Sequence, residues 1–337
     1  MSSVDVPHPP LQPPARRANR ASFRPGAFCA GLLALTGLLL ALSGCGNATS
    51  VISGGVVRVV AGENFWGSIA AQLGGSHAAV ISIVADPNAD PHEYESSTAD
   101  ARAFAQANYV ILNGAGYDTW GQKLLDANPV TGRKVFTVAD LLGKKEGDNP
   151  HFWYNPDDVE RVANQMTADF KALDPADATY FSQQRTAFEN ALEQYHTLIS
   201  EIARQFGGQK VGATEDIFVY LSNALGLDVI SPPAFMQAVA EGNDPPAAAV
   251  AQFQEQIRQK QITVFIYNVQ TITAVTTNLK QLALQEHIPV VGITETIQPP
   301  DATFQDWQDA QLLALQNALD ARAQGGEKLV RALNTLP

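Results

Sequence analysis

Short apolar runs alternate with longer helical patterns along most of the chain. Eight runs rich in β-branched and aromatic residues are candidate strands: 56–60, 80–84, 109–112, 134–137, 209–213, 227–230, 263–267 and 289–293. Strands separated by helical stretches are typical of a parallel sheet whose crossover helices cover its faces. Four runs lie in each half. The pattern therefore predicts an α/β fold of two lobes, each with a roughly four-stranded parallel sheet and flanking helices.

Residues 175–206 separate the two sets of strands and carry an amphipathic helical pattern. After Pro175 the segment contains no glycine or proline, and its apolar residues recur at helical spacing. Asp174-Pro175 is a suitable start and Gly207-Gly208 a suitable end. At about 1.5 Å per residue this is one rigid helix on the order of 45 Å long. We expect it to join an N-terminal lobe, 56–174, to a C-terminal lobe, 207–337, and to limit hinge motion.

The first 45 residues have the layout of a secretion signal. Four arginines precede an apolar run, 27–42, that is short for a stable membrane span. The run closes with Leu42-Ser43-Gly44-Cys45, which resembles the lipobox of bacterial lipoproteins, whose cysteine is acylated and becomes the new N-terminus. We expect residues 1–45 to be a signal peptide ending in a lipobox, with Cys45 lipidated; a plain signal peptide or a short N-terminal anchor is the alternative. Residues 46–55, small and polar, form a flexible leash.

Composition narrows the classes of function. The chain has 337 residues, 45% hydrophobic and 17% charged, which is enough for two cores. Its formal net charge of -12 and the lack of a basic stripe argue against nucleic acid as a partner. The only cysteines, Cys29 and Cys45, lie within the signal segment. The exported body, residues 46–337, therefore has no disulfide and no thiolate metal ligand.

Two histidines each follow a proline in a polar loop after a predicted strand. His92 stands in Asp90-Pro91-His92-Glu93-Tyr94, and His151 in Asn149-Pro150-His151-Phe152-Trp153-Tyr154-Asn155-Pro156. Proline stiffens the backbone that enters each imidazole, which suits a metal site. The remaining histidines of the exported body have simpler interpretations, in a turn, in a helix and before a strand: His77, His196 and His287.

Two carboxylates follow strands of the second lobe in the same way. Glu215 comes directly after the strand that ends at Ala213, and Glu295 after the one that ends at Ile293. Ligands of open α/β sheets gather at the carboxyl ends of the strands, so we expect both carboxylates and both histidines at one edge. An acid in the first turn of a helix is also favoured by the helix dipole, so Glu215 alone is a weak signal. Glu295 alone is equally typical of a solvated acid in a loop. The two histidines and the two glutamates together predict the metal site.

This set of donor atoms restricts which metal ions the site can bind. Two imidazoles and two carboxylates without sulfur suit Mn²⁺, Fe²⁺ or Zn²⁺ and disfavour Cu⁺. A carboxylate can bind through both oxygens, so four side chains can fill five or six positions, which Mn²⁺ tolerates better than tetrahedral Zn²⁺ prefers. Zn²⁺ should still bind tighter in vitro, so availability can decide which ion is carried.

The histidine segments resemble the metal-receptor family of ABC-transporter substrate-binding proteins for manganese, zinc and iron. Asp90-Pro91-His92-Glu93-Tyr94-Glu95 is similar to the family's Asp-Pro-His-x-Tyr-Glu, and residues 149–156 are similar to Asp-Pro-His-x-Trp-x-Asp-Pro. The resemblance covers about residues 56–335. It implies two lobes joined by a long helix, with one metal ion held between them and delivered to a membrane permease and its ATPase.

The resemblance also implies the ligands. His92 and His151 match the two first-lobe ligands. Glu215 matches the third, which is glutamate in many manganese receptors and histidine in many zinc receptors. Glu295 stands where the family usually has aspartate, so Asp301 and Asp216 are alternative oxygen donors.

Other departures from the family pattern are small. Asn149 and Asn155 replace the acids that usually flank the second histidine, which should weaken its orientation only modestly. The stretch before that histidine, residues 141–148, lacks the histidine-rich loop of many zinc receptors, and this favours manganese.

The sequence thus predicts an exported lipoprotein on the outer face of the cytoplasmic membrane. It carries one divalent ion as cargo, with Mn²⁺ favoured, Zn²⁺ a close second and Fe²⁺ a further candidate. We expect a monomer that is not an enzyme. The alternative is an exported metal-dependent hydrolase with Glu93 or Asp216 as general base, although the chain has no Gly-x-Ser-x-Gly elbow, His-Glu-x-x-His helix or P-loop. A third class is a surface adhesin or scaffold with an incidental metal.

Overall fold

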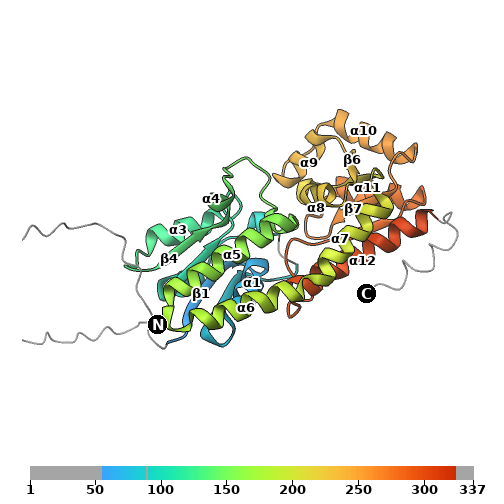
Figure 1. Cartoon of the computed structure of the whole chain (residues 1–337). Coiled ribbons are helices and arrows are strands. Elements are labelled where there is room, and N and C mark those ends of the chain that lie inside the picture. Colours follow the sequence, from blue (N-terminus) through green and yellow to red (C-terminus); the bar gives the residue numbers. More distant parts are fainter. Residues whose placement is uncertain (1–54, 89, 324–337) are drawn as a thin grey trace, which may run out of the picture. The chain divides into compact units, whose positions relative to one another are not determined.

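The computed structural model describes residues 55–88 and 90–323 (Figure 1). Within these residues the chain forms two parallel β-sheets of four strands each. The expected signal peptide, the lipidation site Cys45 and nearly all of the expected leash lie outside the described residues. Among the helices that are described, none is both long and apolar enough to cross a membrane.

The first sheet has the strand order β2-β1-β3-β4, and all its strands are parallel. The strands are β1 (Val57–Glu63), β2 (Ala78–Val84), β3 (Tyr109–Leu112) and β4 (Lys134–Thr137). Every residue of the central strand β3 is buried. This is expected for a parallel sheet that is covered on both faces.

The second sheet repeats this order as β6-β5-β7-β8, again parallel. Its strands are β5 (Lys210–Ala213), β6 (Asp228–Val229), β7 (Val264–Asn268) and β8 (Val290–Ile293). Each of the eight predicted runs overlaps one observed strand, although β6 is shorter than predicted. The predicted α/β fold with two parallel sheets is confirmed.

Helices connect the strands in both sheets. Those associated with the first sheet are α1 (Asn64–Gly74), α2 (Thr98–Gln106), α3 (Thr119–Ala127), α4 (Val138–Leu142) and α5 (Pro156–Leu173). Those of the second are α8 (Val219–Ala224), α9 (Pro233–Ala240), α10 (Ala247–Arg258) and α11 (Ala274–Gln285). Because every connection returns to the same end of its sheet, the loops after the strands share one edge.

The predicted single helix over 175–206 is divided in the structure. A 3-10 turn, η4 (Pro175–Asp177), leads into α6 (Ala178–Ala191), and α7 (Glu193–Phe206) follows after Leu192. Leu192 is fully buried and has φ -84° and ψ -3°, outside regular α-helix geometry. The prediction of one continuous helix is therefore corrected. The spacing of the apolar residues indicates which face of a helix is buried. This spacing continues across the one-residue break at Leu192, so it does not reveal that the helix is interrupted.

A helix outside the predicted linker also contacts both lobes. α12 (Phe304–Ala323) packs along α7 and against β8 (Figure 1). At its start, the Phe304 N–H donates to Oγ of Ser68 in α1 at 3.0 Å, and the Gln305 amide donates to Oε1 of Gln72 at 2.9 Å. The lobes are thus connected by α12 as well as by α6 and α7.

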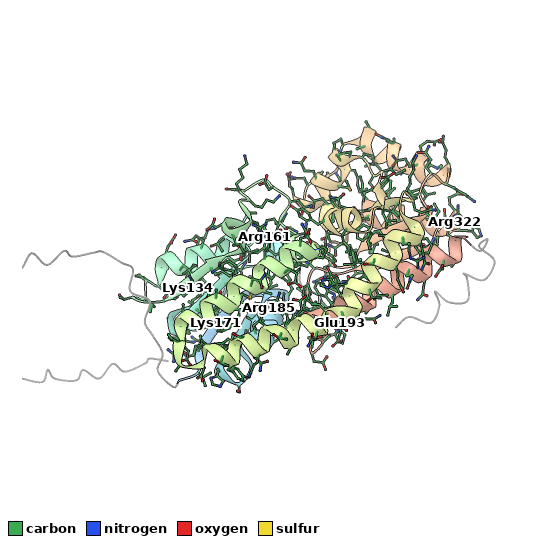
Figure 2. The ribbon with its side chains drawn as sticks, viewed as in Figure 1. Lys134, Arg161, Lys171, Arg185, Glu193 and Arg322 are labelled. Carbon is green, nitrogen blue, oxygen red and sulfur yellow. The ribbon has the colours of Figure 1, made fainter. Side chains whose placement is uncertain are left out.

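Charged side chains along α5, α6 and α7 include Lys171, Arg185 and Glu193 (Figure 2). Arg185 of α6 forms ion pairs with Glu160 of α5 and, at 2.7 Å, with Glu189 of its own helix. The rings of Phe170 and Phe181 stack between the same two helices, with centroids 5.3 Å apart. The α5–α6 junction is therefore held by both apolar and ionic contacts.

Candidate metal site

The four predicted ligands lie in loops at the carboxyl ends of the strands. His92 lies in the 3-10 turn η2 (Pro91–Glu93) after β2, and His151 lies just before η3 (Phe152–Tyr154). Glu215 and Glu295 follow β5 and β8. These residues thus lie at the carboxyl edge of the sheets, which is the edge that the strand order predicts.

The two histidine loops share one local structure. Oδ1 of Asp90 accepts the backbone N–H of His92 at 3.0 Å, and Oδ1 of Asn149 accepts that of His151 at 2.9 Å. In both segments the intervening residue is proline, which fixes its own φ and offers no N–H to compete. Each imidazole therefore leaves a closed Asx turn in a defined direction.

Three of the predicted ligands come together. One ring nitrogen each of His92 and His151 and one oxygen of Glu295 lie within 4.8 Å of one another. Nε2 of His92 is 3.3 Å from Oε2 of Glu295, and Nε2 of His151 is 3.8 Å from the same oxygen. Two donors that each lie about 2.1 Å from one ion are at most about 4.2 Å apart. These two separations are compatible with a shared ion.

Glu215 lies beside this group and is joined to it through an amide. The side-chain amide of Asn268 donates to Oε1 of Glu215 and, at 2.8 Å, to Oε1 of Glu295. Both carboxylates are fully buried. Oε2 of Glu215 has no hydrogen-bond partner among the described residues. One oxygen of Glu215 is therefore free to take a ligand.

The two alternative oxygen donors occupy different places. Oδ1 of Asp216 lies 3.3 Å from Nδ1 of His151 and has no hydrogen-bond partner in the described part of the chain. Asp301 is exposed in the segment before α12 and does not belong to the three-residue group. Only Asp216 is thus placed beside a predicted ligand.

Asn149 sets the orientation of the His151 ring. Its Oδ1 lies 2.8 Å from Nδ1 of His151, so it accepts the Nδ1 proton and leaves Nε2 directed at Glu295. The Asn149 amide also donates to the backbone oxygen of Asp216 at 2.8 Å, which joins the two lobes. The asparagine that replaces the usual acid therefore still acts as the partner of the ring.

Two residues of the site escaped the sequence analysis. The Tyr117 hydroxyl donates to Oε2 of Glu295, and its ring lies edge-on to His92 with centroids 4.8 Å apart. Asn268 bridges the two carboxylates as described above. Tyr117 lies in the loop after β3 and Asn268 is the last residue of β7, so both lie at the carboxyl edge that the strand order predicts. A tyrosine or an asparagine at the end of a strand is no distinctive signal for a metal site, whereas histidine and acidic residues are.

Burial and neighbouring charges shift the pKa values of all four predicted ligands. Burial lowers the pKa of His151, but the neighbouring carboxylates of Asp216 and Glu295 outweigh it and raise that pKa to about 10. Burial acts in the same direction on His92, and the charge of Glu295 reverses it, so the His92 pKa is also raised. Burial raises the pKa of Glu295, whereas the two histidines hold it well below its usual range. Burial and the charge of Glu295 raise the pKa of Glu215 to about 8.

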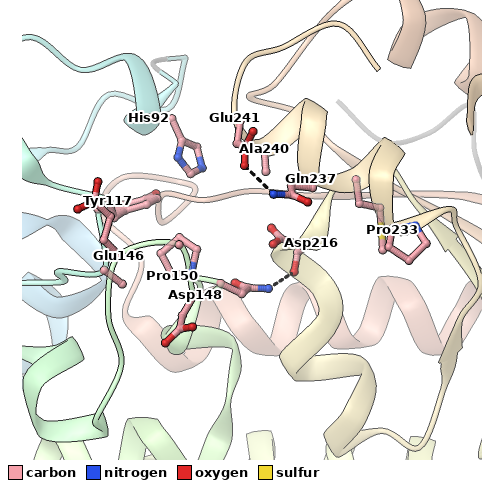
Figure 3. Close-up of a pocket in the computed structure, with 15 residues that line it drawn as sticks. His92, Tyr117, Glu146, Asp148, Pro150, Asp216, Pro233, Gln237, Ala240 and Glu241 are labelled. Carbon is pink, nitrogen blue, oxygen red and sulfur yellow. Dashed lines mark hydrogen bonds between the residues drawn. The ribbon is translucent and has the colours of Figure 1, made fainter. Parts of the chain in front are cut away.

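A cavity of about 560 Å³ lies beside His92 (Figure 3). Its other charged lining residues in the described chain are all acidic: Glu146, Asp148, Asp216 and Glu241. Figure 3 shows His92 on one side of the cavity, with Asp216 and Glu241 facing it from the second lobe. A cleft with one sign of charge concentrates counterions. This cavity is therefore suited to draw cations toward the buried group.

The chain matches a family of transport components. Residues 59–318 match the model of ZnuA, described as zinc-uptake complex component A, periplasmic. Over 249 residues the chain is 24% identical to the metal ABC transporter substrate-binding lipoprotein FimA of Streptococcus parasanguinis, covering 69% of this chain and 79% of that protein. It is 26% identical over 215 residues to the manganese ABC transporter substrate-binding lipoprotein PsaA of Streptococcus pneumoniae, covering 59% and 69%.

Solved structures show the same fold. The Mn-bound periplasmic metal binding protein from Candidatus Liberibacter asiaticus superposes with a TM-score of 0.64 at 18% identity, over 79% of this chain and 99% of that one. The substrate-binding protein FpvC from Pseudomonas aeruginosa, in complex with Mn²⁺, gives 0.64 at 16% identity, over 78% and 98%. At these identities the likeness establishes the fold.

Proposed function

This chain belongs to the family of periplasmic zinc-uptake component A, and on that premise we propose that it is the metal-binding component of an ABC importer. It captures one divalent transition-metal ion outside the cytoplasm as cargo. Relatives are named as substrate-binding lipoproteins of metal ABC transporters. A transport component performs no reaction on its ligand, so the chain is not an enzyme and the hydrolase alternative is unsupported.

His92, His151, Glu215 and Glu295 hold the ion in this proposal. The observation that carries it is the group of buried donors from both lobes: Nε2 of each histidine and Oε2 of Glu215 have no hydrogen-bond partner among the described residues. Buried polar atoms without partners are costly and rare, and an ion would complete the two histidine nitrogens, with Glu215 beside them as a further oxygen donor. Asp216 is the alternative oxygen donor.

Mn²⁺ is the favoured cargo, Zn²⁺ the second candidate and Fe²⁺ the third. The donors are two nitrogens and up to four carboxylate oxygens, which can fill the five or six positions that Mn²⁺ accepts. PsaA and MntA are named for manganese, whereas the family description names zinc. Two carboxylates also balance the charge of a divalent ion, so no extra buried charge is needed.

Delivery requires partners on the membrane. The loaded protein passes the ion to an ABC permease that its ATPase drives. A lipid on Cys45 would hold the receptor at the outer face of the cytoplasmic membrane, as the lipoprotein names of the relatives suggest. The receptor acts as a monomer, because each docking event presents one site to one permease.

Metal analysis of the exported body tests the proposal. Residues 46–337, purified without added metal, should contain close to one divalent ion per chain. One equivalent of Mn²⁺ or Zn²⁺ should raise the melting temperature of the metal-free protein, and His92→Ala should abolish this rise by removing a ligand. The matched control is His196→Ala on α7, a half-exposed histidine, which should keep the full rise.

Two results would overturn parts of the proposal. The absence of any bound ion after growth with several metals would remove the function itself. An unchanged rise in His92→Ala would remove that residue from the ligands. Competition among Mn²⁺, Fe²⁺ and Zn²⁺, followed by anomalous diffraction from the product, would identify both the ion and its ligands.

A further inference from the structure

A second group of metal-binding side chains lies at the other end of α5 from His151. One ligand atom each of His77, Asp174 and Asp177 lies within 4.8 Å of the other two. α5 starts five residues after His151 and ends just before Asp174. Its 18 residues, at about 1.5 Å each, extend ~27 Å. This group shares no residue with the candidate cargo site and lies far from it.

Asp174 is the member of this group that most needs a partner. The residue has 0% exposure, and neither of its carboxylate oxygens has a hydrogen-bond partner in the described chain. Burial and the adjacent Asp177 raise its pKa, while His77 acts in the opposite direction. A buried carboxylate without a partner is destabilising unless a cation or a proton neutralises it.

The imidazole of His77 is held in place by α6. Its Nδ1 lies 2.8 Å from Oδ2 of Asp177, and its ring centroid lies 4.2 Å from that of Tyr180. The preceding turn, η1 (Gly75–His77), approaches α6 so closely that a Cβ on Gly75 would lie 2.2 Å from the Tyr180 hydroxyl. Ser76 N–H donates to the same hydroxyl at 2.9 Å. The ring therefore has a fixed position beside both carboxylates.

We propose that His77, Asp174 and Asp177 form a second site for a divalent transition-metal ion. One imidazole and two carboxylates suit Zn²⁺, Mn²⁺ or Co²⁺ and balance the charge of the ion. The side chains of His77 and Asp177 are 31% and 34% exposed, so water completes the coordination. An ion here joins η1 to the α5–α6 junction. Because three ligands and water hold it, it binds more weakly than the enclosed cargo.

Counting ions under excess metal tests this site. The exported body is suitable because all described residues belong to one compact unit, which begins after residue 46. With excess Co²⁺ or Zn²⁺, equilibrium dialysis and elemental analysis should find two ions per chain in the wild type. His77→Gln should reduce the number to one. The matched control is His196→Gln, whose ring lies 4.0 Å from Glu160 without a third ligand, and it should keep two.

The Asp174→Asn variant distinguishes a role of Asp174 as a metal ligand from a purely structural role. It should also bind one ion, and without metal its melting temperature should equal or exceed that of the wild type, because a buried unpartnered charge is gone. A wild type that binds one ion in excess metal would overturn the second site. So would two ions in Asp174→Asn, or a loss of stability without a change in ion number. His92→Ala removes the cargo ion instead, so failure of the proposed function is seen separately.

Discussion

At the scale of single residues, Asn149 controls how the buried imidazole of His151 meets a metal. Its Oδ1 contacts both the backbone N–H and Nδ1 of that histidine. Asn149→Ala removes both contacts, so the ring can turn and Nε2 loses its fixed direction. We expect the affinity for Mn²⁺, measured by calorimetry, to fall roughly 10–100-fold, the usual cost of removing a partner of a ligating histidine.

Asn155 provides the matched control because it flanks the same histidine and has a different task. Its side chain accepts the Asp157 N–H at 3.1 Å and caps α5. Asn155→Ala should lower the free energy of unfolding by about 1 kcal/mol, the usual cost of a lost N-cap, and leave the Mn²⁺ affinity unchanged. Equal losses of affinity in the two variants would contradict the orienting role of Asn149.

Metal binding should release protons from the site. The pKa of His151 is about 10 and that of Glu215 about 8, so both are protonated in the metal-free protein at pH 7. Ligands must be deprotonated to bind an ion, so loading should release more than one proton per ion. Calorimetry in two buffers with different ionisation enthalpies measures this number. Glu215→Gln should lower it by about one, and zero release by the wild type would contradict the protonated site.

The same pKa shifts give the sign of the pH dependence. His151 has a raised pKa, so its contribution to the stability of the metal-free fold is present below pH 6.5 and is lost as pH rises toward 10. The ion replaces that proton. The metal-induced rise in melting temperature should therefore grow with pH, and the affinity should increase about tenfold per pH unit for each proton released.

At the scale of elements, the helices between the lobes oppose hinge motion. α6 and α7 run from the first lobe to the second, interrupted only at Leu192, and α12 packs along α7 while its first turn contacts α1. Two lobes joined by more than one packed helix cannot swing apart without breaking buried contacts. We expect small-angle scattering of residues 46–337 to give the same radius of gyration with and without Mn²⁺.

A contraction on metal addition would contradict this expectation and indicate a hinge. The residue to examine would then be Leu192, where the regular helix is broken. Variants there need a control on the same face, and Leu198, buried on α7, provides one. The lobe boundary at residue 207 stays a prediction. α12 lies C-terminal to that boundary, and yet its first residue donates a hydrogen bond to α1 in the first lobe.

At the scale of the whole molecule, the N-terminal cysteine should decide where the receptor resides. If Cys45 carries the lipid, Cys45→Ser in the full chain should move the exported protein from the membrane fraction to the soluble fraction, because no acyl chain would hold it. Immunoblotting of the two fractions measures this. If Cys45→Ser and Cys45→Ala both stay in the membrane fraction, another anchor holds the protein and lipidation at this residue is contradicted.

The sequence by itself determined the strands, their division between two sheets and the edge at which His92 and Glu295 lie. Each of these follows from local patterns, since apolar runs specify strands and chain order specifies the edge. Only the tertiary structure decided the distances between the two lobes, the Asn268 bridge between carboxylates, the break at Leu192 and the contact of α12 with α1. Those features depend on how distant segments pack, and no local pattern reports packing across lobes.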